Sequence, residues 1–209
     1  MTDEIGYLKF YDDEEYLLEV GERFRENGKI DAADFYMLLI WKANRAKNYH
    51  RDRLKDKSGT FQAAVRNIAS ELFASTEQEQ RLQILMEKWG FVLPTATAIL
   101  TILYPDDFTV YDSRVRCEVG RAYRPWLGWD EYEQFKKAVI DETPEGLSLR
   151  NKDRFLIGRS IRRGIEGIAS LEVCVEFSAV DCLQDRPRRR TAKPGRTNSN
   201  SEDDRLPAQ

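Results

Sequence analysis

The chain has 209 residues, of which 41% are hydrophobic, which is enough for one compact domain or two small helical lobes with a sizeable core. The formal net charge of −3 does not indicate a nucleic-acid partner, but residues 42–57 carry seven basic and two acidic residues, so one face can still be basic. The unpaired spacing of Cys117, Cys174 and Cys182 argues against a disulfide framework, a zinc site and a four-cysteine iron–sulfur cluster, and no apolar run approaches the roughly 20 residues of a membrane span.

Helical periodicity dominates the chain and predicts an all-α fold. Asp12 or Asp13 caps a first helix that Gly28 ends, and Asp31 caps a second, apolar helix whose basic end continues through Arg53. Further helices are expected from near Thr60, from the capping box Thr76-x-x-Glu79 to Gly90, over 94–104, from Asp112 or Ser113, from the cap Asp130 to about 142, and over 151–168.

The end of the chain differs from the rest in composition. Residues 171–183 mix helix and strand signals and are left unassigned, whereas residues 185–209 are basic and polar and predict a disordered tail. We therefore expect one helical domain over residues 1–184. Residues 1–6 are polar and acidic and do not resemble a signal peptide, so a cytoplasmic protein is expected.

Residues 90–98, with the sequence GFVLPTATA, join two of the predicted helices. Gly90 stands just past a helix end, where glycine accommodates a left-handed backbone. Pro94 suits the first turn of the next helix, and the small residues after it permit close packing. This pattern also fits an ordinary corner between two helices.

A single aspartate follows in the string Val110-Tyr111-Asp112-Ser113-Arg114-Val115, after a break at residues 105–107. Asp112 stands 112 − 95 = 17 positions after Thr95, at the expected start of a helix. Aspartate is a common helix cap, so Asp112 fits a cap or a functional carboxylate, and the two roles are compatible.

Together, these two strings resemble the helix-hairpin-helix DNA glycosylase superfamily over roughly residues 30–170. The family pattern is broadly Leu-Pro-Gly-Val-Gly-x-x-Thr-Ala, followed at a similar interval by Val-Asp-Thr-His-Val. Gly90 takes the place of the first glycine and Asp112 that of the aspartate, while Val92 replaces the second glycine. The resemblance implies a two-lobed helical bundle, with the hairpin around residues 78–104 and a catalytic loop over 105–115.

The resemblance also implies an activity. The enzyme would hydrolyse the N-glycosidic bond of a damaged or modified base, with Asp112 stabilising positive charge on the sugar. Bifunctional members of the family carry a lysine where this chain has Pro94, so the resemblance implies a monofunctional enzyme without an iron–sulfur cluster. It further implies a nucleoid-associated monomer that binds double-stranded DNA and has no cofactor or metal beyond a monovalent cation at the hairpin.

In this interpretation, outward-facing backbone amides of the hairpin bind DNA phosphates. The extruded base needs aromatic walls, which we assign to Trp41 and Tyr49, although Trp41 also fits a core position. His50 is expected on the surface. The expected DNA-binding residues are Gly90, Phe91, Val92, Thr95, Arg114, Arg116, Lys152 and Arg154.

Two other interpretations stay open. The chain can be a catalytically inactive helix-hairpin-helix module that binds DNA and recruits a partner, or a related enzyme that processes a base–sugar bond by another route. For an active enzyme, the base can be a housekeeping alkylation lesion or a hypermodified base of viral DNA in antiviral defence. The presence of Asp112 favours an enzyme over the inactive module.

Overall fold

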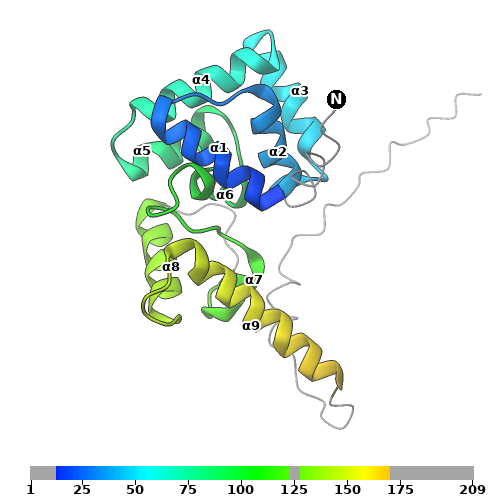
Figure 1. Cartoon of the computed structure of the whole chain (residues 1–209), viewed down its shortest axis with the longest axis vertical. Coiled ribbons are helices and arrows are strands. Elements are labelled where there is room, and N and C mark those ends of the chain that lie inside the picture. The colour runs from blue at the N-terminus through cyan, green and yellow to red at the C-terminus, as the bar shows by residue number, and fades with distance from the viewer. Residues whose placement is uncertain (1–12, 123–127, 170–209) are drawn as a thin grey trace, which may run out of the picture.

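The computed structural model describes residues 13–122 and 128–169, and within these ranges every regular element is a helix, which confirms the predicted all-α fold. Helices α1–α6 form one lobe and α7–α9 a second, and the connector 104–112 joins them (Figure 1). The unassigned segment 171–183 and the tail predicted for 185–209 lie outside the described residues. The elements are α1 (Asp13–Asn27), α2 (Ala32–Ala43), α3 (Lys47–Ser58), α4 (Phe61–Ala74), α5 (Gln78–Gln83), the π-helical turn η2 (Ile84–Lys88), α6 (Leu93–Leu103), α7 (Ser113–Glu118), α8 (Trp129–Asp141) and α9 (Leu149–Ala169).

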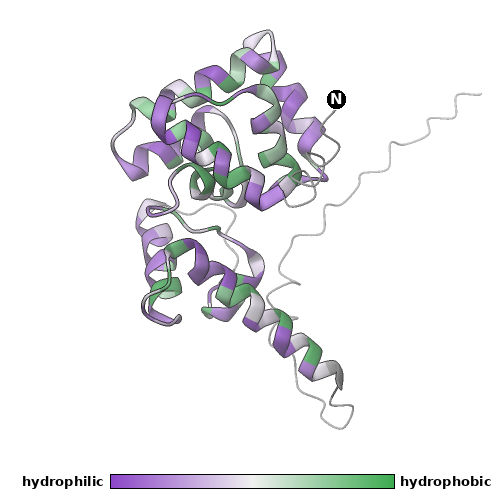
Figure 2. Ribbon diagram, in the orientation of Figure 1, coloured by the Kyte–Doolittle hydropathy of each residue, from purple (hydrophilic) through white to green (hydrophobic). Residues whose placement is uncertain are grey.

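Helix α6 is the centre of the first lobe. All of its residues except Pro94 are buried, and helices α1, α2 and α5 pack against it. Figure 2 shows hydrophobic residues along α6, whereas the outward turns of α1 are hydrophilic. Burial of this apolar helix is the main hydrophobic contribution to the lobe. None of the described helices has the length and apolar composition needed to cross a lipid bilayer.

Helix α1 crosses the end of α6 at Gly21. A Cβ atom at this position would lie 2.2 Å from the carbonyl oxygen of Ile102, so the close approach requires glycine. One turn later, Arg25 Nη1 donates hydrogen bonds to the carbonyl oxygens of Ile102 and Leu103, both at 3.3 Å. These carbonyl groups lie in the last turn of α6 and lack partners within the helix, so Arg25 completes its C-terminal end.

The connector belongs to the core of the second lobe. Tyr111 is buried, and its ring lies edge-on to Phe135 of α8 with the ring centroids 4.9 Å apart. Leu156 of α9 is also fully buried, and α9 packs against both α7 and α8. The residues that lead to Asp112 are therefore fixed by packing.

The basic end predicted for the second helix is a separate helix. Helix α2 ends at Ala43, residues 44–46 form a turn, and α3 begins at Lys47. Lys47 Nζ donates hydrogen bonds to the backbone carbonyl oxygen and to Oδ1 of Asn44, at 3.0 and 2.6 Å. The lysine thus satisfies a carbonyl group at the end of α2, and the basic residues of 42–57 are divided between two helices.

Two predicted helix caps are wrong. Helix α5 begins after Glu77, which makes no side-chain cap, so the capping box of Thr76 and Glu79 does not form. Helix α8 begins after Gly128, so Asp130 lies inside the first turn. There its carboxylate still favours the positive end of the helix. In both cases the polar residue lies one or two positions away from the cap.

Gly21→Ala is expected to lower the free energy of unfolding by about 1–3 kcal/mol, because the added methyl group must displace the carbonyl group of Ile102. Gly158→Ala in α9 is the matched control, since a Cβ atom there meets no atom within 4 Å. This control should gain about 0.5–1 kcal/mol from the better helix propensity of alanine. Denaturant unfolding measures both values, and equal stabilities would contradict the close crossing of α1 and α6.

Candidate functional site

The predicted hairpin begins with a turn that requires glycine. Gly90 has a φ angle of +67°, in the left-handed region, as the sequence predicts. Before it, the helix widens into η2, where the N–H of Trp89 donates to the carbonyl oxygen of Ile84 at 3.0 Å. The N–H of Phe91 donates to the carbonyl oxygen of Leu85 at 2.9 Å. The wider turn ends the helix and directs the chain into α6.

The hairpin turn presents backbone donors. Within the described residues, the N–H groups of the exposed residues Gly90 and Val92 donate to no protein acceptor, whereas the N–H groups of Thr95 and Ala96 donate to the carbonyl oxygen of Val92, both at 2.9 Å. The Val92 side chain is 57% exposed, so the turn lies at the surface. Free amides beside the positive end of a helix are suitable donors for an anionic oxygen atom.

The side chains of two predicted DNA-binding residues of the hairpin face inward. Phe91 is 2% exposed and Thr95 is 5% exposed, and their N–H groups already donate to the carbonyl oxygens of Leu85 and Val92. The ring of Phe91 lies 5.2 Å from that of His50, between centroids. His50 is therefore buried, which corrects its predicted surface position. Burial and the neighbouring charge of Arg53 lower the pKa of His50.

Helix α3 supplies two cations to the hairpin. Arg53 Nη1 donates a hydrogen bond to the carbonyl oxygen of Trp89, and Lys57 Nζ donates one to the carbonyl oxygen of Lys88. A monovalent metal cation at the hairpin would need carbonyl oxygens of this turn. These two oxygens already accept from positive groups that would repel it, so they do not fit the expected cation.

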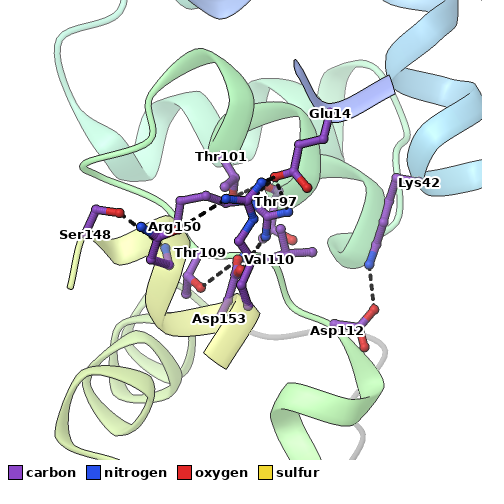
Figure 3. A network of polar contacts seen from close by, with 12 residues as sticks. Glu14, Lys42, Thr97, Thr101, Thr109, Val110, Asp112, Ser148, Arg150 and Asp153 are labelled. Atoms are coloured by element: carbon purple, nitrogen blue, oxygen red, sulfur yellow. Dashed lines mark hydrogen bonds and ion pairs between the residues drawn. The ribbon is translucent and has the colours of Figure 1, made fainter. Parts of the chain in front are cut away.

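Asp112 is the N-cap of α7, as predicted. Its Oδ1 accepts a hydrogen bond from the N–H of Arg114 at 2.9 Å, and its Oδ2 accepts one from Lys42 Nζ at 2.7 Å (Figure 3). Burial raises the pKa of the Asp112 carboxyl group, but the charge of Lys42 and these hydrogen bonds outweigh burial, so the pKa lies below its ordinary value. The carboxylate is therefore ionised at neutral pH.

Hydrogen bonds hold the connector just before Asp112. The N–H of Tyr111 donates to Thr97 Oγ1 at 3.0 Å. The N–H of Val110 and the hydroxyl group of Thr109 donate to Asp153 Oδ2, at 3.3 and 3.4 Å (Figure 3). Asp112 follows these anchored residues directly, so its position depends on α6 and α9 as well as on α7.

A buried ion cluster lies behind the connector. Arg150 Nε and Nη2 donate to Glu14 Oε1 of α1 at 2.9 and 2.7 Å, while its Nη1 donates to Asp153 Oδ1 (Figure 3). The guanidinium carbon of Arg150 lies 5.3 Å from the ring centroid of Trp41. Burial raises the pKa of Asp153 to about 6, against the opposing effects of Arg150 and the N–H of Val110. This cluster joins the two lobes.

Two of the four charged residues predicted to bind DNA are buried. Arg116 is 2% exposed and donates to the carbonyl oxygen of Arg121 at 2.9 Å. Lys152 is 8% exposed and donates to Thr143 Oγ1 and to the carbonyl oxygen of Pro144, at 3.1 and 2.9 Å. These side chains therefore stabilise turns instead of lying at the surface where DNA binding was expected, and their contact with DNA stays a prediction.

The other two charged residues predicted to bind DNA, Arg114 and Arg154, are exposed. Arg154 Nη2 forms an ion pair with Glu14 at 2.6 Å. Of the two predicted pocket residues, Trp41 is half-buried beside Arg150, whereas Tyr49 is 66% exposed. The roles of these side chains in binding DNA or a base stay predictions.

No family model, curated protein or solved structure matches this chain. Within residues 13–122 and 128–169, no three His, Cys, Asp or Glu residues gather as potential metal ligands. The geometry of the hairpin turn and of Asp112 therefore carries the functional argument.

Sequence reasoning missed one residue at this site. Lys42 is the first residue of the basic run 42–57, and its ammonium group contacts Asp112, which lies 70 positions later. No local pattern connects two such distant residues. The end of the apolar helix α2 is the only signal, since it places Lys42 beside the core of the first lobe.

Arg150→Met is expected to lower the free energy of unfolding by about 3–5 kcal/mol, because Asp153 and Glu14 would lose their buried partner. Lys42→Met should cost about 1 kcal/mol or less, since its ion pair with Asp112 is partly exposed and screened by solvent. Denaturant unfolding of both variants measures the difference. A larger loss for Lys42→Met would identify the Lys42–Asp112 pair as the main contact between the lobes.

Proposed function

We propose that this protein is a DNA base-excision enzyme, a monofunctional N-glycosylase of the helix-hairpin-helix type that acts on a damaged or modified base. The observation that carries the proposal is the placement of the Asp112 carboxylate, which Lys42 and the N–H of Arg114 hold at a helix start on the connector between the two lobes. The proposal places the enzyme on double-stranded DNA as a monomer in the nucleoid-containing cytoplasm.

The proposed chemistry needs one fixed negative charge. Breaking an N-glycosidic bond leaves positive charge on the sugar, and a carboxylate held beside C1′ stabilises that charge and orients a water molecule. A preorganised carboxylate does this without reorganisation during the reaction. Asp112 is suited to the role, because Lys42 and the N–H of Arg114 hold its two oxygen atoms in place.

The proposed DNA contact is the hairpin turn. The free N–H groups of Gly90 and Val92 can donate to phosphate oxygens, which fixes the position of the protein on DNA without reading sequence. Arg53 and Lys57 add positive charge next to this turn. Exposed basic residues of α3, such as Arg51 and Lys55, extend the positive surface.

The second candidate function is a catalytically inactive DNA-binding module that recruits a partner. Its support is the ion pair of Asp112 with Lys42, which neutralises the carboxylate and joins the two lobes. In that case, Asp112 is only a helix cap and a contact between lobes. A base-excision enzyme of antiviral defence and one of DNA repair would release different bases. The residues described here would serve both.

Asp112→Asn is expected to lower the rate of base release by about 10²-fold or more, because the substitution removes the charge that stabilises the sugar cation. Binding to DNA should stay near that of the parent protein. An abasic-site assay over a panel of modified duplexes measures release, with Asp106→Asn, an exposed aspartate of the same connector, as the matched control. Equal rates for Asp112→Asn and the parent would leave Asp112 as a cap only.

Gly90→Val should weaken binding to all duplexes about equally, since phosphate contacts carry no base identity. The new side chain resists the left-handed backbone, at a cost of roughly 1–2 kcal/mol, and its Cβ atom would lie 2.3 Å from Arg53 Nη1.

Gly146→Val is the control for this experiment, because Gly146 has a φ angle of +80° but open space around it. Binding to an undamaged duplex and to the best substrate is measured together with thermal unfolding. A folded Gly90→Val protein with parental DNA affinity would show that the turn is only a helix corner.

A further inference from the structure

The contact of Lys42 with Asp112 crosses between the two lobes. Lys42 stands near the end of α2 in the first lobe, and Asp112 begins α7 in the second (Figure 3). The atoms Nζ and Oδ2 are 2.7 Å apart, and the two side chains are 18% and 27% exposed. The charged pair is thus largely sheltered, although part of it still reaches solvent.

This pair presents a difficulty for a carboxylate that is to stabilise a cation. While Lys42 is protonated, it and Asp112 together carry no net charge, and their field at a neighbouring sugar is only that of a dipole. Asp112 becomes an uncompensated negative charge only when Lys42 loses its proton. Catalysis by Asp112 therefore depends on where that proton goes.

We propose that Lys42 is the proton donor to the departing base. This inference rests on the proposed function, base excision at Asp112. As the C1′–N bond breaks, its electron pair goes to the base, and the base takes a proton from the Nζ ammonium group. Lys42 becomes a neutral amine, so it no longer compensates the negative charge of Asp112 as the sugar becomes positive. Water then adds to C1′, and the proton that it releases restores the ammonium group.

The ion pair favours an acid over a nucleophile at this position. Before the bond breaks, Lys42 Nζ is engaged as a hydrogen-bond donor to Asp112 Oδ2, whereas a nucleophilic amine needs a free lone pair at that stage. A merely structural role is also less suited to the pair, because the buried cluster of Arg150, Glu14 and Asp153 already joins the lobes.

A proton donor defines the class of base that this site would release. An uncharged base leaves poorly as an anion and gains from protonation during bond cleavage. A purine alkylated at N7 already carries a positive charge and leaves without a proton. We therefore assign the site to uncharged modified bases that need an acid to leave.

The first test uses duplexes in which the target nucleotide is a cationic pyrrolidine abasic analogue or a neutral tetrahydrofuran one. The preference for the cationic analogue mimics stabilisation of the sugar cation and needs no knowledge of the base. Lys42→Met should raise this preference by about fivefold to tenfold, because Asp112 loses its competing cation. Asp112→Asn should abolish the preference, and Lys29→Met, at an exposed position between α1 and α2, should leave it unchanged.

The results of this test separate the two proposals. Equal weakening of both duplexes by Lys42→Met would identify Lys42 as a structural contact and overturn the inference. An unchanged preference in Lys42→Met would also overturn it. If neither the parent protein nor Asp112→Asn prefers the cationic analogue over the neutral one, base excision at Asp112 itself is contradicted.

The second test is kinetic. Lys42→Met should slow the release of the best uncharged base of the panel by about 10²-fold. It should instead speed the release of 7-methylguanine by about fivefold to tenfold, because that base needs no acid and Asp112 loses its competing cation. Equal losses for the two bases would overturn the role as a proton donor. The last measurement is trapping of a covalent protein–DNA adduct with borohydride on an abasic duplex. An adduct that forms with the parent protein but not with Lys42→Met would identify Lys42 as a nucleophile instead.

Discussion

The position of Asp112 depends on the side chain of Arg150. Its guanidinium group binds Glu14 of the first lobe and Asp153 of α9, and Asp153 in turn accepts from the connector two residues before Asp112. Buried charges of this kind are stable only when each has its partner, so the three residues keep one arrangement. Because the cluster joins α1, α9 and the connector, it aligns the two lobes and sets the place where Asp112 begins α7.

Some basic residues of the chain bind carbonyl groups inside the structure, and others are exposed to solvent. The net charge of the sequence does not distinguish these two groups. Arg53 and Lys57 satisfy carbonyl groups at the hairpin, and Arg25 does the same at the end of α6. Each contact stabilises a helix end and also brings positive charge near it. Lys55 on α3 is exposed and available to a partner, whereas Arg51, also exposed, forms an ion pair with Asp52 at 2.8 Å. A basic stretch in the sequence therefore contains both internal and external charges.

Local patterns predicted the parts of the site that are local. The glycine at the end of a helix and the aspartate at the start of another were identified at Gly90 and Asp112, since both depend on a few neighbouring residues. The contact of Lys42 with Asp112 could not be predicted, because it depends on how two lobes pack. The burial of Arg116 and Lys152 was missed for a related reason.

Charged residues are normally exposed. Only the tertiary structure shows that Arg116 and Lys152 are buried as donors to the backbone carbonyl oxygens of Arg121 and Pro144. The boundary between α2 and α3 was missed because Asn44 and Lys47 satisfy the helix end with side chains that are common within helices. The helical fold itself could be predicted from the hydrophobic periodicity of the sequence. This signal is summed over many residues, so a single unexpected contact does not change the prediction.

The π-helical turn of residues 84–88 has a consequence for how this hairpin can vary between related chains. A π-helical turn holds one more residue than an α-helical turn of the same height, and each residue of an α-helix turns the chain by about 100°. Deleting one residue between 84 and 88 would restore a regular helix and rotate Gly90 away from α3. Substitutions in this turn have to preserve the packing of Leu85 and Met86, which are buried, and of Ile84, which packs against the core. The length of the segment is thus under a stricter constraint than its composition.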